Sequence, residues 1–298
     1  MDKVKNKRWN RGKRAMILSF HPCITADHQI ILGSRRLENR DLSLIDEAEA
    51  IILPQSCSKE LYEWCGQSSA RLFPNYNARF RYPGKAGQTL MFKETGSLYP
   101  ETILWDSVIN LRESCRNSWP HKLPFLVKKS ESHEGEGVFV VKDQETFEYA
   151  LKQISLSGKD ILNGIISQEL IHSEGNVLRV VKIGEVIVSY WKRPLKNGQV
   201  ITTVSSGAKI DKIWRKDLQE EGSLKVKKLS ESMEINLAAF DLVFPIKERD
   251  PRPFFLEINY FFGRRGLGGS FNYYKSLFKA VCAWLSCEGL DPGSVALV

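Results

Sequence analysis

The sequence has no two cysteines in a Cys-x-x-Cys spacing, although it contains six cysteines in 298 residues. Isolated cysteines in a chain of this size suit a reducing compartment, so we expect a cytoplasmic protein. No apolar run is long enough to cross a membrane. The apolar run at residues 15–20 is short and ends at His21-Pro22, so we do not expect a signal peptide. Internal repeats and low-complexity segments are also absent from the sequence.

Histidines at ligand spacing are missing as well. His21, His28 and His121 have no partner at such spacing, so we expect all three in loops. The sequence shows no Ser-His-Asp or Cys-His set either, so nothing in it points to covalent catalysis by a protein nucleophile.

A basic surface on the folded part of the chain is not expected. The total charge is +8, but the first 14 residues hold seven Lys or Arg and a single Asp, which leaves only about +2 for the rest. Nucleic-acid binding normally needs a basic face on the folded domain, so we do not expect a nucleic-acid partner. We interpret residues 1–14 as a disordered basic tail.

The remaining composition, 42% apolar and 26% charged, describes a soluble globular protein with one large or two modest domains. Residues 15–120 read as a first α/β domain. Buried strands are predicted at 15–20 and 50–54, and a helix with a Ser58 N-cap lies between Ser58 and Gly66. This alternation predicts a small parallel sheet.

The most informative stretch lies near the end of the chain, at residues 236–259. Two apolar runs, 236–246 and 254–259, read as an antiparallel pair of buried strands. Glu257 and Asn259 share one face, about 7 Å apart along the strand. Asp241 lies in the middle of the partner strand, where burying a carboxylate is costly unless a positive group meets it.

These three residues have two interpretations. If the strand register aligns them, two carboxylates and an amide oxygen form an all-oxygen site of the kind that Mg²⁺ prefers, with positions left for water and phosphate. Alternatively, Glu257 and Asn259 lie on the wet face of an edge strand.

A second motif precedes this pair. A short apolar strand ends at Lys128-Lys129, and a loop containing Gly135 and Gly137 follows it. Backbone N–H groups of such a loop can approach phosphate oxygens, and a lysine at the strand end adds a positive charge. A hairpin turn with a solvated lysine is the other interpretation.

Taken in order, these features resemble the ATP-grasp superfamily, above all ribosomal-protein glutamate ligases and glutathione synthetases. The resemblance spans roughly residues 123–270. It rests on Lys128, the loop to Gly137, the segment Gln168–Ile171, Arg179, Arg193, Asp241, Glu257 and Asn259.

The resemblance implies an α+β ATP-grasp fold, two α+β subdomains gripping a nucleotide, behind a small α/β domain. The ATP-grasp domain would cover residues 121–298, with a lid-like subdomain at 121–171 and a central subdomain at 172–298. Two positions depart from the family pattern. Val177 replaces the ribose-contacting Asp, with Asn176 and Glu174 as possible substitutes, and Thr203 replaces a metal-side Asn.

The resemblance also implies roles for the motif residues. The nucleotide would contact Lys85, Lys128, Gly135, Gly137, Glu169, Leu170, Ile171 and Arg179. Arg193 and Arg265 would steady the reacting phosphate, and Asp241, Glu257 and Asn259 would bind metal. From the residues alone, Lys85 could equally face water in a first helical turn, Arg179 could pair with a structural acid, and the loop around Arg265 could be a plain connection.

The activity implied by the resemblance is ATP- and Mg²⁺-dependent carboxylate–amine ligation through an acyl phosphate, with Mn²⁺ as an acceptable substitute metal. The substrates would be small-molecule or peptide carboxylates and amines. We expect no membrane partner, and a homo-oligomer is compatible with the sequence. A small-molecule kinase and a non-catalytic nucleotide-binding module are the alternatives.

Overall fold

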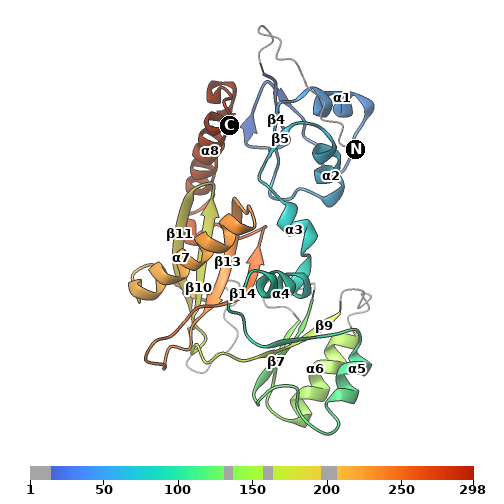
Figure 1. Ribbon diagram of the computed structural model, residues 1–298, viewed down its shortest axis with the longest axis vertical. Helices are drawn as coiled ribbons and strands as arrows, with labels where there is room; N and C mark the ends of the chain where they lie inside the picture. The colour runs from blue at the N-terminus through green and yellow to red at the C-terminus, as the bar shows by residue number, and fades with distance from the viewer. Residues whose placement is uncertain (1–14, 131–136, 157–163, 196–206) are drawn as a thin grey trace. The chain divides into compact units, whose positions relative to one another are not determined.

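The computed structural model describes residues 15–130, 137–156, 164–195 and 207–298, and the chain divides into two compact units (Figure 1). One unit combines the chain up to Pro74 with Tyr274–Val298, and the other comprises Asn75–Tyr273. The basic tail, Gly135 and Thr203 lie outside the described residues.

The first unit is built on a parallel sheet with strand order β3-β1-β4-β5, which confirms the parallel sheet predicted from the sequence. Its elements are β1 Ile17–Ser19, β3 His28–Gln29, α1 Asn39–Glu47, β4 Ala50–Ile52, α2 Lys59–Gln67 and β5 Arg71–Phe73. The Ser58 hydroxyl accepts a hydrogen bond from the Leu61 N–H at 3.1 Å, so the predicted N-cap of α2 is confirmed.

The C-terminal end of the chain belongs to this first unit. Strand β15 Ala296–Leu297 pairs with β2 Ile24–Thr25, and helix α8 Ser270–Cys287 brings Trp284 within 5.4 Å of Phe73, measured between ring centres. A short 3₁₀ helix, η2 Pro292–Ser294, joins α8 to β15. The unit therefore differs from the expected domain at residues 15–120, because its last elements come from the other end of the sequence.

The second unit contains two sheets. The smaller is antiparallel with order β6-β9-β7-β8, and α5 and α6 lie together against it (Figure 1). Its elements are β6 Thr102–Trp105, α5 Val108–Ser114, β7 Phe125–Lys129, β8 Val138–Val141, α6 Gln144–Leu156 and β9 Ile165–Glu169. Phe125 and Val127 of β7 join the core beneath the helices. Leu126 and Lys128 consequently point to the opposite face.

The larger sheet has the order β12-β11-β10-β13-β14 and is antiparallel throughout. Its elements are β10 Val177–Ile183, β11 Val186–Arg193, β12 Lys209–Asp211, α7 Lys216–Ser232, β13 Leu237–Val243, β14 Phe254–Asn259 and the 3₁₀ helix η1 Arg265–Leu267. Helix α7 crosses one face of this sheet (Figure 1). It runs unbroken through Gly222, which packs against Leu178 of β10.

Two further helices, α3 Asn77–Arg81 and α4 Gly84–Glu94, precede the smaller sheet in the chain. The Gln88 side chain of α4 forms two hydrogen bonds with the backbone of Ile258, donating to its carbonyl and accepting from its N–H, both at 2.8 Å. Because β14 is an edge strand, Gln88 occupies backbone groups that would otherwise lack a strand partner. No helix in the described part of the chain is long and apolar enough to span a membrane.

Candidate functional site

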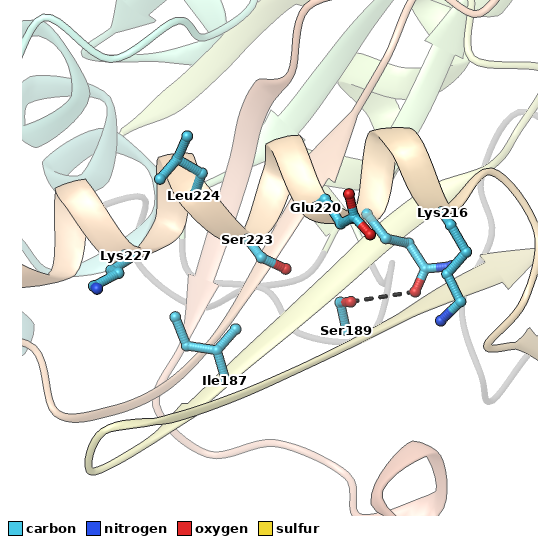
Figure 2. A pocket seen from close by; sticks show the side chains of 8 residues that line it. Ile187, Ser189, Lys216, Glu220, Ser223, Leu224 and Lys227 are labelled. Atoms are coloured by element: carbon cyan, nitrogen blue, oxygen red, sulfur yellow. Dashed lines mark hydrogen bonds between the residues drawn. The ribbon is translucent and has the colours of Figure 1, made fainter.

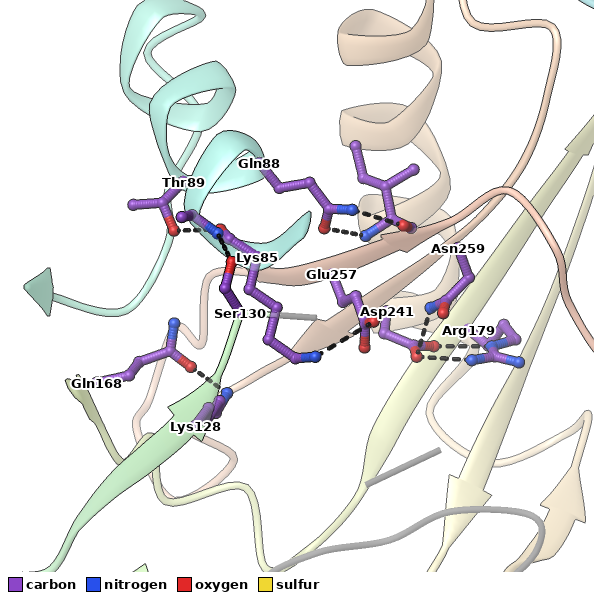
Figure 3. Close-up of polar contacts among 12 residues, drawn as sticks. Lys85, Gln88, Thr89, Lys128, Ser130, Gln168, Arg179, Asp241, Glu257 and Asn259 are labelled. Atoms are coloured by element: carbon purple, nitrogen blue, oxygen red, sulfur yellow. Dashed lines mark hydrogen bonds and ion pairs between the residues drawn. The ribbon is translucent and has the colours of Figure 1, made fainter. Parts of the chain in front are cut away.

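The site is centred on the antiparallel pair β13–β14. Asp241 lies directly opposite Glu257, and Asn259 lies opposite Ala239, so the three polar side chains share one face of the larger sheet (Figure 3). The register that the sequence left open is thereby settled. A bulge follows Asp241 in the pairing, so Leu256 has no direct partner in β13.

Asp241 is held by two cations, one on the neighbouring strand β10 and one on the next strand, β11. Arg179 of β10, its cross-strand neighbour, donates from Nε to Oδ1 at 2.8 Å and from Nη2 to Oδ2 at 2.7 Å. Lys192 of β11 donates from Nζ to Oδ2 at 2.9 Å. The positive group required by a buried carboxylate is therefore supplied by the protein itself.

The protonation of this group follows from its surroundings. Burial alone would raise the pKa of Asp241, but the charges and hydrogen bonds of Arg179 and Lys192 outweigh it and hold this pKa well below its usual range. Burial lowers the pKa of Lys192, and the charge of Asp241 opposes that shift. The cluster thus contains an ionised carboxylate between two positive groups.

Two more lysines approach from other elements. The Lys85 ammonium of α4 lies 3.9 Å from Glu257 Oε1, and Lys128 of β7 donates to Gln168 Oε1 of β9 (Figure 3). Gln168 in turn donates to Thr102 Oγ1 at 2.8 Å, which fixes the amide oxygen toward Lys128. Burial first, and then the charge of Lys85, lowers the pKa of Lys128 to about 8.

The formal charge of this cluster is positive. Among the described side chains of this cluster, the four cations Lys85, Lys128, Arg179 and Lys192 outnumber the two carboxylates Asp241 and Glu257, so these six side chains carry a net charge of about +2. Such a cluster suits a polyanion such as a chain of phosphates.

A cavity of about 150 Å³ opens beside the charged cluster. It is lined by Leu126 of the smaller sheet, by Val177, Val243 and Leu256 of the larger one, and by the connecting segment Glu169–Gly175. The predicted hinge residues Glu169, Leu170 and Ile171 therefore lie in its wall. The Glu169 N–H already donates to the Glu101 carbonyl at 2.9 Å.

The position of the missing ribose-contacting Asp also borders this cavity. Val177 lines it, as does Glu174, whose backbone has a positive φ of 52°. The buried Asn176 side chain donates to the Ser173 carbonyl at 2.9 Å and thereby stabilises its own loop. Of the two substitutes considered from the sequence, only Glu174 is among the residues that line the cavity, and its Oε1 lies 3.4 Å from Lys247 Nζ.

Arg193 does not join the cluster. Side chains alternate along β11, so Tyr190 and Lys192 face the carboxylates while Arg193 faces α7. There its guanidinium donates to Asp211 Oδ2 at 3.1 Å and lies 4.3 Å from the Trp214 ring centre. The cation that the sequence analysis missed is Lys192, and counting alternate positions from Tyr190 would have found it.

The glycine-rich loop after β14 contacts the same face of the sheet. Gly266 of η1 packs against the ring of Tyr190, so closely that a Cβ would lie 2.0 Å from a ring carbon. Arg265 precedes it and is exposed, whereas Arg264 lies 4.7 Å from the Tyr273 ring centre. Gly137, in the other predicted loop, has a φ of 67° and lies close to the Lys129 side chain.

A trio resembling a catalytic triad occurs elsewhere in the second unit. His121 Nε2 lies 2.9 Å from Ser167 Oγ, and His121 Nδ1 lies 3.6 Å from Glu101 Oε2. Ser167 is 0% exposed, and its oxygen also accepts a hydrogen bond from Trp105. A nucleophile must reach its substrate, so this trio is structural. His121 lies in a loop, as expected, and is buried there.

A larger hollow of about 380 Å³ lies on the opposite face of the larger sheet, between β11 and α7 (Figure 2). Ser189, Gln219 and Glu220 are among its lining residues, and Ser189 donates to Gln219 at 3.2 Å. The carboxylate pair and the four cations lie on the other side of the sheet. The cavity beside the charged cluster is smaller, but it lies on the same face of the sheet as Asp241 and Glu257.

Metal binding can be tested against the donors present. Within the described ranges, no group of three His, Cys, Asp or Glu side chains suits a metal ion. Glu257 is partly exposed and Asn259 lies two residues along the same face, so these two oxygen donors fit Mg²⁺, with positions left open. Asp241 fits less well, because both of its oxygens already accept from cations.

Known proteins resemble this chain in sequence pattern and in fold. The model of the RimK-like ATP-grasp domain matches residues 102–269, which contain the whole charged cluster except Lys85. No curated protein sequence matches the chain.

Three solved structures illustrate the shared fold. The ADP complex of purK, an N5-carboxyaminoimidazole ribonucleotide synthetase, has a TM-score of 0.56 at 12% identity over 78% of this chain and 59% of that one. D-Alanine-D-alanine ligase from Helicobacter pylori has a TM-score of 0.55 at 17% identity over 78% and 71%. A RimK domain ATP-grasp protein from Sphaerobacter thermophilus DSM 20745 has a TM-score of 0.53 at 12% identity over 85% and 94%.

These identities support a common fold rather than a common substrate, and the chain spans less than two thirds of the synthetase's length. The expected α+β fold, with a parallel-sheet unit at the N-terminal side, is confirmed. The family model covers more than half of the chain, so the protein belongs to the RimK-like ATP-grasp family.

Proposed function

We propose that this protein is an ATP-dependent carboxylate–amine ligase that uses Mg²⁺. The observation that carries the proposal is the combination, on one face of the larger sheet, of a small apolar cavity and a charged cluster with a net charge of about +2. A nucleotide has the same two parts, an apolar base and a chain of negative phosphates.

Different residues of the cavity and the cluster bind different parts of the nucleotide. Leu126, Val177 and Leu256 provide apolar contacts for the base, and backbone groups around Leu170 and Ile171 provide its polar contacts. Lys85 and Lys128 supply positive charge for the phosphates, and Gln168 keeps Lys128 in place. Glu174, which borders the cavity, takes the ribose contact of the missing Asp.

Glu257 and Asn259 are the residues that we propose for Mg²⁺. When bound, Mg²⁺ would neutralise charge that develops on the phosphates. Asp241 contributes differently, since it fixes Arg179 and Lys192 on the same face.

The reaction that we propose is that of the ATP-grasp ligases, which this chain resembles in fold. The substrate carboxylate attacks the γ-phosphate, ADP leaves, and an amine then displaces phosphate from the acyl phosphate. Arg265, exposed in the loop that packs on Tyr190, is the residue that we propose for holding the substrate carboxylate. Arg193 receives no role in this chemistry, because it faces α7.

ADP release can test the proposal. The full chain is incubated with ATP, Mg²⁺ and a panel of amino acids and short peptides, and hydroxylamine is added in parallel. We expect ADP release that needs both a carboxylate and an amine, and a hydroxamate when hydroxylamine replaces the amine. A stable phosphorylated product without an amine would show a kinase, and ATP binding without turnover over the whole panel would show a binding module.

A further inference from the structure

Lys192 is a buried cation that the resemblance to the family did not assign. It is only 5% exposed, and it lies in β11, one residue before Arg193. The alternation of the strand turns it toward the carboxylate face, where its ammonium contacts Asp241 at 2.9 Å. A lysine is rarely buried to this degree without a function for its charge.

The acceptor positions of Asp241 are largely used. Oδ1 accepts from Arg179 Nε, and Oδ2 accepts from both Arg179 Nη2 and Lys192 Nζ. Asn259 Nδ2 approaches Oδ2 as well, at 3.4 Å. A divalent cation on this carboxylate would lie against two full positive charges, at a position where Asp241 is already neutralised.

We infer that the ammonium of Lys192 takes the place of one divalent cation beside Asp241, so that this protein binds a single Mg²⁺ with its nucleotide, at Glu257 and Asn259. This inference rests on the proposed nucleotide site and specifies how many metal ions bind there. Lys192 acts as a fixed positive charge that positions Asp241 and Arg179. It also prevents a metal ion from binding to Asp241.

Counting bound Mn²⁺ tests the inference without measuring turnover. The full chain is titrated with Mn²⁺ in the presence of a saturating non-hydrolysable ATP analogue, and bound metal is counted by equilibrium dialysis and by electron paramagnetic resonance. We expect one Mn²⁺ per bound nucleotide and the spectrum of an isolated ion. The Lys192→Met variant removes one positive charge and frees one acceptor position on Asp241 Oδ2, so we expect two ions per nucleotide and a spectrum broadened by their coupling.

Two controls separate loss of charge from loss of structure. Lys192→Arg keeps the charge and should still bind one ion, and so should Lys209→Met, which removes an exposed lysine from the neighbouring strand β12. If Lys192→Met does not fold, Lys192→Gln takes its place with the same expected count of two.

Each other outcome is decisive. Two ions in the wild-type protein would overturn the inference and leave the proposed function standing. One ion in both Lys192→Met and Lys192→Gln would show that Lys192 does not keep the second ion out. Failure of the analogue to bind at all would overturn the proposed function, and the inference with it.

Discussion

Asp241 of β13 and Glu257 of β14 face each other, but their surroundings differ, so we expect the two carboxylates to have different roles. Asp241 is buried and bonded to two cations, whereas Glu257 is partly exposed and lies 3.9 Å from a single lysine. Removing the charge of Asp241 would leave Arg179 and Lys192 buried without their partner. Removing the charge of Glu257 would mainly weaken binding of the Mg²⁺ ion that we propose at this residue.

The Asp241→Asn and Glu257→Gln variants should therefore differ in kind. We expect Asp241→Asn to lower the free energy of unfolding by about 3 kcal/mol, because it breaks a buried ion pair. Glu257→Gln should leave this free energy nearly unchanged and abolish Mg²⁺-dependent ATP turnover. Urea denaturation and an ADP assay measure the two effects, and retained turnover in Glu257→Gln would contradict the metal assignment.

The effect of Asp241 should also depend on pH. Its pKa is held below the value of about 4 that it has in an unfolded chain. Its contribution to stability is therefore fully present above about pH 4 and is lost as the pH falls further. The difference in unfolding free energy between wild type and Asp241→Asn should be constant from pH 5 to 8 and shrink below pH 4.

From the lowered pKa of Lys128 we predict that nucleotide affinity decreases at alkaline pH. Its pKa is lowered to about 8, and phosphates favour its charged form. The affinity for a non-hydrolysable ATP analogue should thus be constant between pH 7 and 7.5 and fall above pH 8, by at most about tenfold per pH unit. Lys128→Arg, which stays charged, should show no such fall in fluorescence or calorimetric titrations; a fall of equal size would exclude Lys128 as its cause.

At the level of elements, the loop after β14 is fixed by a glycine that touches an aromatic ring. A side chain at position 266 would overlap Tyr190, whereas a Cβ at Gly263 would meet no atom within 4 Å. We expect Gly266→Ala to lower the free energy of unfolding by about 1–3 kcal/mol, as overpacking does, and to weaken substrate binding. Gly263→Ala is the matched control and should change neither quantity in urea denaturation and substrate titration.

Helix α4 is connected through Gln88 to β14, the strand that carries the proposed Mg²⁺ ligands. Its two hydrogen bonds hold Ile258, the residue between Glu257 and Asn259. We expect Gln88→Met to lower the free energy of unfolding by about 1–3 kcal/mol, because two buried backbone groups lose their partner. It should also raise the Mg²⁺ concentration that gives half-maximal ATP turnover. Lys93→Met, exposed on the same helix, should do neither, and an unchanged Mg²⁺ requirement in Gln88→Met would refute this positioning role.

The limits of sequence analysis are visible in the same elements. Period-two alternation predicted correctly that Glu257 and Asn259 share a face and that residues 236–259 form an antiparallel pair. For β11 the family pattern indicated Arg193, whereas side-chain alternation along the strand puts Lys192 on the carboxylate face. The bulge after Asp241 could not be predicted, because it depends on how two distant strands pair rather than on either local sequence.

At the level of the whole molecule, the first unit is assembled from both ends of the chain. Strand β15 completes a pair with β2, and Arg71 Nε lies 2.8 Å from Glu288 Oε2. Contacts over more than 200 residues leave no local pattern, so the sequence suggested a continuous domain instead. All residues of the proposed nucleotide site belong to the second unit.

This division predicts that stability and nucleotide binding can be altered separately. Leu285 of α8 is 0% exposed within the first unit, so Leu285→Ala should lower the free energy of unfolding of that unit by about 2–5 kcal/mol. The affinity for the ATP analogue should remain unchanged, because the charged cluster and its cavity lie between Asn75 and Tyr273. Ile31→Ala, at a position 56% exposed in the same unit, serves as the control and should alter neither stability nor affinity. Chemical denaturation followed by circular dichroism, with analogue titration under native conditions, measures both quantities. A loss of affinity in Leu285→Ala equal to its loss of stability would show that the two units fold and bind as one.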